Sequence, residues 1–314
     1  DKFNATSYDD ITVVIISLQT FAGMWINTFI VSVLGLAWVR KKSFNSNEKI
    51  LFFLGCSRFC YFSNLWAYFF LLIKYPWCFY VQPIPQLLSA VHNFFNASNT
   101  WASACLCVFY CIKIANFRHI VFTFLKAKID RIVPGLLLVS VLVSLIVSIL
   151  CYDITDRALV GNLSSNIEGN LWVRITKMDN HYFIIFFING FLFAAAFTAA
   201  ILSALLLLFS LWRHKCRMQT NSVKDFSMEA HIRAMKSILT FIVVYTINFI
   251  YLVLSLIYAS EKNITVIFLV LIFQYALPAL HSLILIFSNP KLEETLLRTL
   301  TCVKCKVCLR QEPE

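Results

Sequence analysis

IPQLLSAVHNFFNASNTWASACLCVFYCIKIANF, residues Ile84–Phe117, is the stretch that decides the fold. It carries no charge until Lys113, so it is long enough to cross a bilayer as a helix, which takes about 20 apolar residues. Polar side chains nevertheless recur in it at helical spacing, at His92, Asn96, Asn99 and Ser103. Because a polar stripe is costly against lipid, we expect this face to meet other helices or a watery cavity.

The whole chain has the composition of an integral membrane protein. Of its 314 residues, 60% are hydrophobic and 14% are charged, whereas a soluble domain is roughly half apolar and a quarter charged. Seven segments are long enough to span a bilayer: Ile11–Trp38, Ile50–Ile73, Ile84–Ile112, Ile132–Tyr152, Tyr182–Trp212, Ser237–Tyr258 and Ile264–Phe287. The sequence therefore predicts an all-α integral membrane protein, a seven-transmembrane helix bundle, followed by a short amphipathic eighth helix from Pro290.

The placement of the basic residues predicts the orientation. Most of the 27 Lys and Arg lie in the loops after the odd-numbered spans and in the C-terminal tail. By the positive-inside rule the N-terminus is extracellular and the C-terminus cytoplasmic, in a multi-pass protein that we assign to the plasma membrane. The net charge of +11 is therefore a topology signal, and we expect membrane lipids rather than nucleic acid as its partners.

No long linker or internal repeat divides the chain, so we expect a single transmembrane domain over residues 1–300 and a cytoplasmic tail over residues 301–314. The basic segment Asn116–Arg131 is interpreted as a short helix lying in the membrane interface. Asn162, in an Asn-Leu-Ser triplet of the longest outer loop, is the best glycan acceptor.

The cysteines do not predict a disulfide framework, although Cys78 and Cys151 near the outer ends of their spans form a conceivable pair. The tail cysteines are too few for a zinc site and are candidates for lipidation: Cys302, Cys305 and Cys308. We expect no metal, no cofactor and no catalytic residues, because neither a ligand cluster nor a nucleophile–base arrangement is visible.

Arg58 is the only charged side chain inside a predicted span. An arginine in hydrocarbon costs several kcal/mol unless it is paired or solvated, so Arg58 must face the bundle interior. No span contains Asp or Glu, which leaves Asn27, backbone carbonyls and internal water as its plausible partners. Its depth near the cytoplasmic side favours a structural or switching latch over a ligand contact.

Four motifs identify a family resemblance. Phe109-Tyr110-x-x-Lys113-Ile114-Ala115-Asn116-Phe117 closely resembles the end of the third span in type 2 taste receptors, the bitter taste receptors among G-protein-coupled receptors. Similar matches occur in Leu208–Met218, in Glu229–Lys236 and in His281–Leu292. Residues that also fit this family are Asn27, Ser57, Arg58, Trp101 and Asn162. The positions that we expect to have a structural or switch role are Asn27, Arg58, Trp101, His281 and Asn289.

The resemblance implies a ligand pocket in the outer half of the bundle, where the positions of His92, Asn96 and Tyr245 line it. The sequence itself places further polar residues at that level: Asn93, Asn248 and Gln274. With no carboxylate in any span, we expect small, mostly neutral bitter compounds held by aromatic packing and a few hydrogen bonds. For Asn93 and Asn96, helix–helix hydrogen bonding is the competing interpretation.

The resemblance also implies coupling to a heterotrimeric G protein of the gustducin or inhibitory type at the inner face. The residues expected around that opening are Tyr110, Lys113, His214, Lys215, Arg217 and Met218. Anionic lipid is the competing partner for the cations. Tyr245, below the pocket, is the expected pivot between two packings of the bundle.

Other classes of membrane protein fit less well. A secondary transporter usually has intramembrane acids, broken helices or repeats, and the chain lacks these features. The remaining alternative is a chemosensory receptor of the related vomeronasal type 1 class, which detects pheromones.

Overall fold

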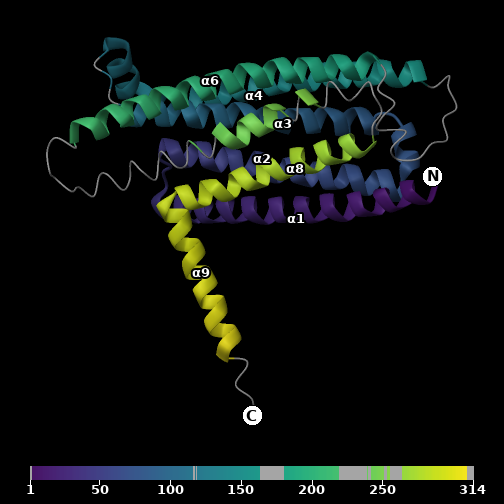
Figure 1. Cartoon of the computed structure of the whole chain (residues 1–314), viewed down its shortest axis with the longest axis horizontal. Helices are drawn as coiled ribbons and strands as arrows, with labels where there is room; N and C mark the ends of the chain where they lie inside the picture. Colours follow the sequence, from purple (N-terminus) through teal and green to yellow (C-terminus); the bar gives the residue numbers. More distant parts are fainter. Residues whose placement is uncertain are drawn as a thin grey trace.

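The computed structural model describes residues 2–115, 117, 119–162, 180–218, 239, 242–250, 253–254 and 264–309. Its helices are α1 (Lys2–Lys41), α2 (Ser46–Lys74), the short 3-10 helix η1 (Pro76–Tyr80), α3 (Ile84–Ile114), α4 (Ile120–Asn162), α6 (Asn180–Met218), α8 (Ile264–Ser288) and α9 (Pro290–Leu309). Residues 242–250 are helical as well. Figure 1 shows the long helices side by side along one axis, with α9 leaving them at a steep angle.

Within the described residues, four helical stretches are long and apolar enough to cross a membrane: Val13–Lys41, Ser46–Lys74, Ile120–Arg157 and Phe187–Arg213. Large apolar side chains cover the outside of these helices, including Trp25 and Phe191, which are 79% and 69% exposed. In water, apolar patches of this kind would be unfavourable, whereas in lipid they match the surroundings. The predicted fold class, an all-α membrane bundle with a further helix after the last span, is confirmed.

α3 is the helix around which the others pack. It contacts α2, α4 and α6, while α8 packs against α1. One side of its lower half, with Leu106, Phe109 and Ile112, is buried in the main core against α1, α2 and α4. Another side packs through Ala104 and Cys107 against the small residues of α6. The polar stripe predicted on this helix therefore faces other helices.

α1 and α2 approach each other closely because glycines line their contact. A Cβ added to Gly23 would meet the Phe62 ring at 2.4 Å, and one added to Gly55 would meet Val31 at 3.0 Å. Small residues at helix contacts are typical of membrane bundles, where close packing replaces the hydrophobic effect as the source of association. This approach fixes the register in which the deeply buried Arg58 of α2 faces its neighbours.

α4 corrects one expectation from the sequence. The segment before the fourth span forms no separate interfacial helix, because α4 runs without a break from Ile120 through Pro134. Ile129 and Val133, on either side of the start of the span, are both buried in the main core. Leu137, after the proline, also packs against this core, so contacts on both sides of Pro134 support the helix although proline removes one backbone hydrogen bond.

The base of α9 is fastened to the bundle by polar contacts. The Asn289 side chain accepts hydrogen bonds from the backbone N–H groups of Lys291 at 3.1 Å and Leu292 at 3.4 Å, which is an N-cap. The Lys291 ammonium lies 2.7 Å from a carboxylate oxygen of Glu48, whose other oxygen accepts the backbone N–H of Asn45 at 3.1 Å. Asn289, expected as a structural residue, therefore starts the helix that Glu48 anchors.

The apolar side of α9 divides into two parts. Leu292 is fully buried and Leu296 packs against the main core, whereas Leu297 and Leu300 are exposed. α9 starts at the end of the bundle opposite to the N-terminal end of α1 (Figure 1). α9 crosses the bundle axis at this point, and its position along the membrane surface stays a prediction for the eighth helix.

Glu48→Gln tests the anchor of α9. We expect the free energy of unfolding to fall by about 1–2 kcal/mol, because a largely buried charge-assisted hydrogen bond is lost. Thermal unfolding in detergent, with hydrogen exchange of the first turn of α9, measures the effect. The matched control is Glu294→Gln, which breaks an exposed pair with Arg298 on α9 itself and is expected to cost under about 0.5 kcal/mol. Equal losses in the two variants would contradict the anchoring role.

Candidate functional site

The centre of the molecule is a hydrogen-bond network around Arg58 of α2. Its side chain is 2% exposed. The guanidinium donates to the Ser282 hydroxyl at 2.8 Å and to the Ser103 hydroxyl at 3.3 Å, and it contacts Nδ1 of His281. Arg58 therefore joins α2 to α3 and to the lower half of α8.

Two further helical segments take part in this network. The Ser282 hydroxyl donates to the Asn27 side-chain oxygen at 2.9 Å, and the Asn27 amide donates to the Gly23 carbonyl at 2.8 Å within α1. The Tyr245 hydroxyl, from the helical residues 242–250, is hydrogen-bonded to Arg58 and Ser103. The network thus ties α1, α2, α3, α8 and residues 242–250 together, and we call it the Arg58 network.

Neutral dipoles stabilise the buried charge. None of the partners of Arg58 within the described ranges is an Asp or Glu. Because a guanidinium only donates, Nδ1 of His281 must accept, which places the proton of the neutral imidazole on Nε2. Asn27, expected as a direct partner, reaches Arg58 through Ser282 instead. Ser103, Ser282 and His281 thus engage both terminal nitrogens of the guanidinium without an ion pair, whose desolvation would itself be expensive.

Tyr245 connects the Arg58 network to an aromatic stack. Its ring stands edge-on to His281, with centroids 5.6 Å apart, and lies parallel to Phe193 of α6 at 6.1 Å. Phe193 and Phe197 in turn stack on Phe249 at 6.3 and 5.2 Å. The expected pivot residue is therefore in contact with both the charged centre and the α6 side of the bundle.

Trp101, expected as a structural residue, packs beside this stack. It lies against the cluster that includes Tyr245, Ala196 and Leu277. Its indole N–H is buried and has no partner among the residues that the structure describes. Trp101 therefore contributes packing at the level of the Arg58 network.

In the outer half of α3, His92 faces α2. Its ring lies 5.1 Å from that of Tyr61, centroid to centroid, and is partly buried. Tyr61 belongs to an aromatic cluster with Phe62, Phe69 and Tyr275. The His92 ring therefore packs against aromatic side chains, and its role in the wall of a ligand pocket stays a prediction.

Asn93 faces α6 and has both polar atoms engaged. Its amide donates to the Ser89 carbonyl at 2.8 Å, and its oxygen accepts from the Asn189 amide at 2.7 Å. This geometry supports the competing interpretation of Asn93 as a link between helices, and its ligand role stays a prediction. The sequence reasoning missed Asn189, although an isolated Asn in the apolar run of the fifth span was a usable signal.

The remaining pocket candidates are less constrained. Asn96 and Asn248 are both half-buried, and the Asn96 side chain makes no hydrogen bond to any residue that the structure describes. Asn99, one turn below Asn96, is buried, and its side-chain oxygen has no partner in the described part of the chain. The side chain of Gln274 lies outside what the structure describes. Asn96 and Asn99 thus leave amide groups open on one face of α3.

At the inner face, two of the expected transducer contacts are well placed. The Tyr110 hydroxyl is hydrogen-bonded to the Asn47 side chain, and the exposed Lys113 pairs with Asp130 at 3.1 Å. The other four expected contacts are in the last turns of α6, and their side chains lie outside the described set: His214, Lys215, Arg217 and Met218. The motif Glu229–Lys236 lies outside the described residues altogether.

The predicted modification sites lie at the ends of helices. Asn162 is the last residue of α4, and its side chain lies outside the described set, so glycosylation stays a prediction. Cys78 and Cys151 are both buried free thiols, so the conceivable disulfide is not formed. Cys302 is an exposed free thiol on α9, as lipidation would require, whereas the side chains of Cys305 and Cys308 are not described.

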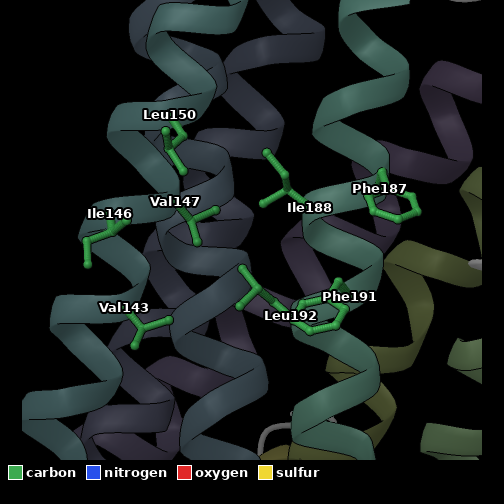
Figure 2. A pocket seen from close by; sticks show the side chains of 8 residues that line it. All are labelled: Val143, Ile146, Val147, Leu150, Phe187, Ile188, Phe191 and Leu192. Carbon is green, nitrogen blue, oxygen red and sulfur yellow. The ribbon is translucent and has the colours of Figure 1, made fainter.

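A groove of about 280 Å³ lies between α4 and α6. Figure 2 shows its apolar side chains on the two helices, with Val143 and Leu150 toward its ends on α4 and Phe187 and Phe191 on α6. None of the predicted ligand residues lines this groove. This groove is purely apolar and separate from the polar face of α3.

Comparisons with known proteins agree with this architecture. Residues 5–304 match the family model described as taste receptor protein (TAS2R). The chain is 30% identical to taste receptor type 2 member 9 of Homo sapiens over 304 residues, 96% of each chain. It is 32% identical to taste receptor type 2 member 8 of Papio hamadryas, over 94% of this chain and 97% of that one. To taste receptor type 2 member 41 of Mus musculus it is 34% identical, over 79% and 81%.

Ser282→Ala tests the Arg58 network. It removes an acceptor of the buried guanidinium, so we expect the free energy of unfolding to fall by about 1–3 kcal/mol. The matched control is Ser288→Ala on the same helix, where the hydroxyl bonds only to the Ile284 carbonyl of its own turn. Thermal unfolding of the two purified variants in one detergent measures the difference, and a control as destabilised as Ser282→Ala would argue against the network.

Proposed function

The chain belongs to the TAS2R family of taste receptors, and from this premise we propose that it is a G-protein-coupled receptor for small, mostly neutral bitter compounds. The observation that carries the proposal is the Arg58 network, which joins five helical segments directly beneath the expected pocket. A receptor needs such a connection, because its ligand must alter helix packing at the other end of the bundle.

The ligand chemistry follows from the outer half of the bundle. His92 beside Tyr61, and the half-buried Asn96 and Asn248, supply aromatic surface and amide groups. The seven predicted spans contain no carboxylate that would hold an ammonium group by charge. Ligands of low charge, bound by stacking and one or two hydrogen bonds, are therefore favoured.

Transmission is proposed to run through Tyr245. This residue contacts Arg58 and His281 on one side and the stacked ring of Phe193 on the other. A ligand that shifts the aromatic stack changes the hydrogen bond at Arg58, and with it the relative positions of α2, α3 and α8. Ligand affinity must differ between the two packings, typically by 1–3 kcal/mol, for this to act as a switch.

The inner face is proposed to bind a G protein of the gustducin or inhibitory type. Tyr110 and Lys113 lie in the last two turns of α3. The four further candidate residues lie in the last turns of α6, the helix that follows the next outer loop. The basic loops support the proposal that this face is cytoplasmic and the N-terminus extracellular, in a receptor of the plasma membrane. Anionic lipids are the expected neighbours of the remaining cations.

The direct test of function is a calcium response in transfected cells that contain a gustducin-type G protein. We expect at least one neutral compound in a broad bitter panel to evoke a response that mock-transfected cells lack. Surface labelling of the receptor provides the expression control. A receptor that reaches the surface and responds only to a pheromone panel would replace the proposal with the vomeronasal alternative.

Tyr245→Phe tests the transmission step, because it keeps the stacked ring and removes the hydroxyl that binds Arg58. We expect the agonist concentration for half-maximal response to rise by at least about five-fold, the lower limit of typical coupling energies. The control is Tyr75→Phe, at an exposed tyrosine in the outer connection after α2. Unchanged potency and efficacy in Tyr245→Phe at normal surface expression would remove Tyr245 from the mechanism.

A further inference from the structure

Lys113 at the end of α3 is held by an acid of the same chain. Its ammonium lies 3.2 and 3.1 Å from the two carboxylate oxygens of Asp130 on α4. Asp130 also accepts a hydrogen bond from the hydroxyl of Ser46, a buried residue in the first turn of α2. Side chains of three helices thus meet at the Asp130 carboxylate, on the face that is expected to bind the transducer.

This ion pair contributes little to holding the fold. The side chains of Lys113 and Asp130 are 49% and 59% exposed, and exposed pairs contribute at most about 1 kcal/mol to stability. The neighbouring pair of Glu48 and Lys291 differs, because its carboxylate side chain is only 12% exposed. The Glu48–Lys291 pair is thus largely buried and anchors α9, whereas the Lys113–Asp130 pair is exposed to solvent and to other anions.

The surroundings of Asp130 favour a negatively charged group. Besides Lys113, whose ammonium lies 5.5 Å from the centre of the Phe109 ring, Lys49 of α2 is close enough to act on Asp130 electrostatically. Asp130 is the only acid in the segment from residue 116 to residue 131, which also contains Lys126, Lys128 and Arg131. A single carboxylate among cations is readily replaced by another carboxylate.

We propose that Asp130 is an internal substitute for an acidic group of the transducer. In the free receptor it occupies the ammonium of Lys113, and a carboxylate on the docking helix of the G protein displaces it. The inference rests on the proposed function, because it assigns Lys113 to the transducer site. It adds that the transducer contacts Lys113 through a carboxylate, and that Asp130 of the receptor competes with this carboxylate and so inhibits docking.

The experiment measures nucleotide exchange by a purified gustducin-type heterotrimer on membranes containing the full-length receptor, with no bitter compound present. For Asp130→Asn we expect the heterotrimer concentration for half-maximal exchange to fall, by up to about five-fold, the equivalent of an exposed ion pair. Lys113→Ala should raise it. The matched control is Asp153→Asn, which breaks the exposed pair with Arg157 at the other end of α4 and should change nothing.

A second measurement separates this inference from the proposed function. A synthetic acidic peptide with the sequence of the G protein's C-terminal helix is titrated against receptor in nanodiscs by fluorescence anisotropy. The inference is supported if the peptide binds Asp130→Asn more tightly than wild type, and if this gain is lost when amides replace the carboxylates of the peptide. This result would support it even if no compound of the bitter panel evokes a response. Binding that is unchanged, or weakened as in Lys113→Ala, overturns it, because Asp130 would then not compete.

Discussion

A buried arginine without an acid is the constraint on which the rest of this structure depends. Arg58 is 2% exposed, and its contacts in the described residues are hydroxyl and imidazole groups. Such a charge is tolerable only when most of its donors are satisfied, because an unpaired ion in the membrane interior costs several kcal/mol. The helices that supply those acceptors must therefore lie at fixed heights relative to α2. Ser103 fixes the height of α3, His281 and Ser282 fix that of α8, and Asn27 links α1 to Ser282.

We propose that the same constraint gives the bundle a means of transmission. A network of neutral dipoles has several near-equivalent hydrogen-bond patterns, whereas a buried ion pair is costly to separate. Tyr245 contacts this network and the aromatic stack of α6 at once. A small rearrangement in the outer half can then alter the hydrogen bonds at Arg58 and move the inner ends of the helices, where α2 contacts α3, α4 and α9 through Asn47, Ser46 and Glu48.

Much of the fold could be predicted from hydrophobic length alone. The predicted third span, Ile84–Ile112, differs from α3 by two residues, and the last, Ile264–Phe287, differs from α8 by one. α1 and α6 extend beyond their predicted spans, and α4 differs most. The sequence does not show that Ile129 and Val133 pack into the core on both sides of the expected start of the fourth span. Local signals such as a proline or a basic stretch do not report this tertiary packing.

The candidate site was predicted less completely, for a physical reason. The intramembrane charge identified Arg58 as an interior residue and Asn27 as a plausible neighbour. The sequence does not reveal that Ser282 lies between them, because this depends on the relative heights of α1, α2 and α8. Asn93 shows the same limit: its partner Asn189 lies on a helix that is remote in sequence.

The most direct test of the central claim is a double-mutant cycle on agonist-evoked nucleotide exchange, using Tyr245→Phe, Ser282→Ala and the double variant. Both side chains contact Arg58 and do not contact each other in the described hydrogen bonds. If Arg58 couples the stack to α8, the effects on agonist potency will deviate from additivity by at least about 0.5 kcal/mol. Additive effects within error would contradict the account.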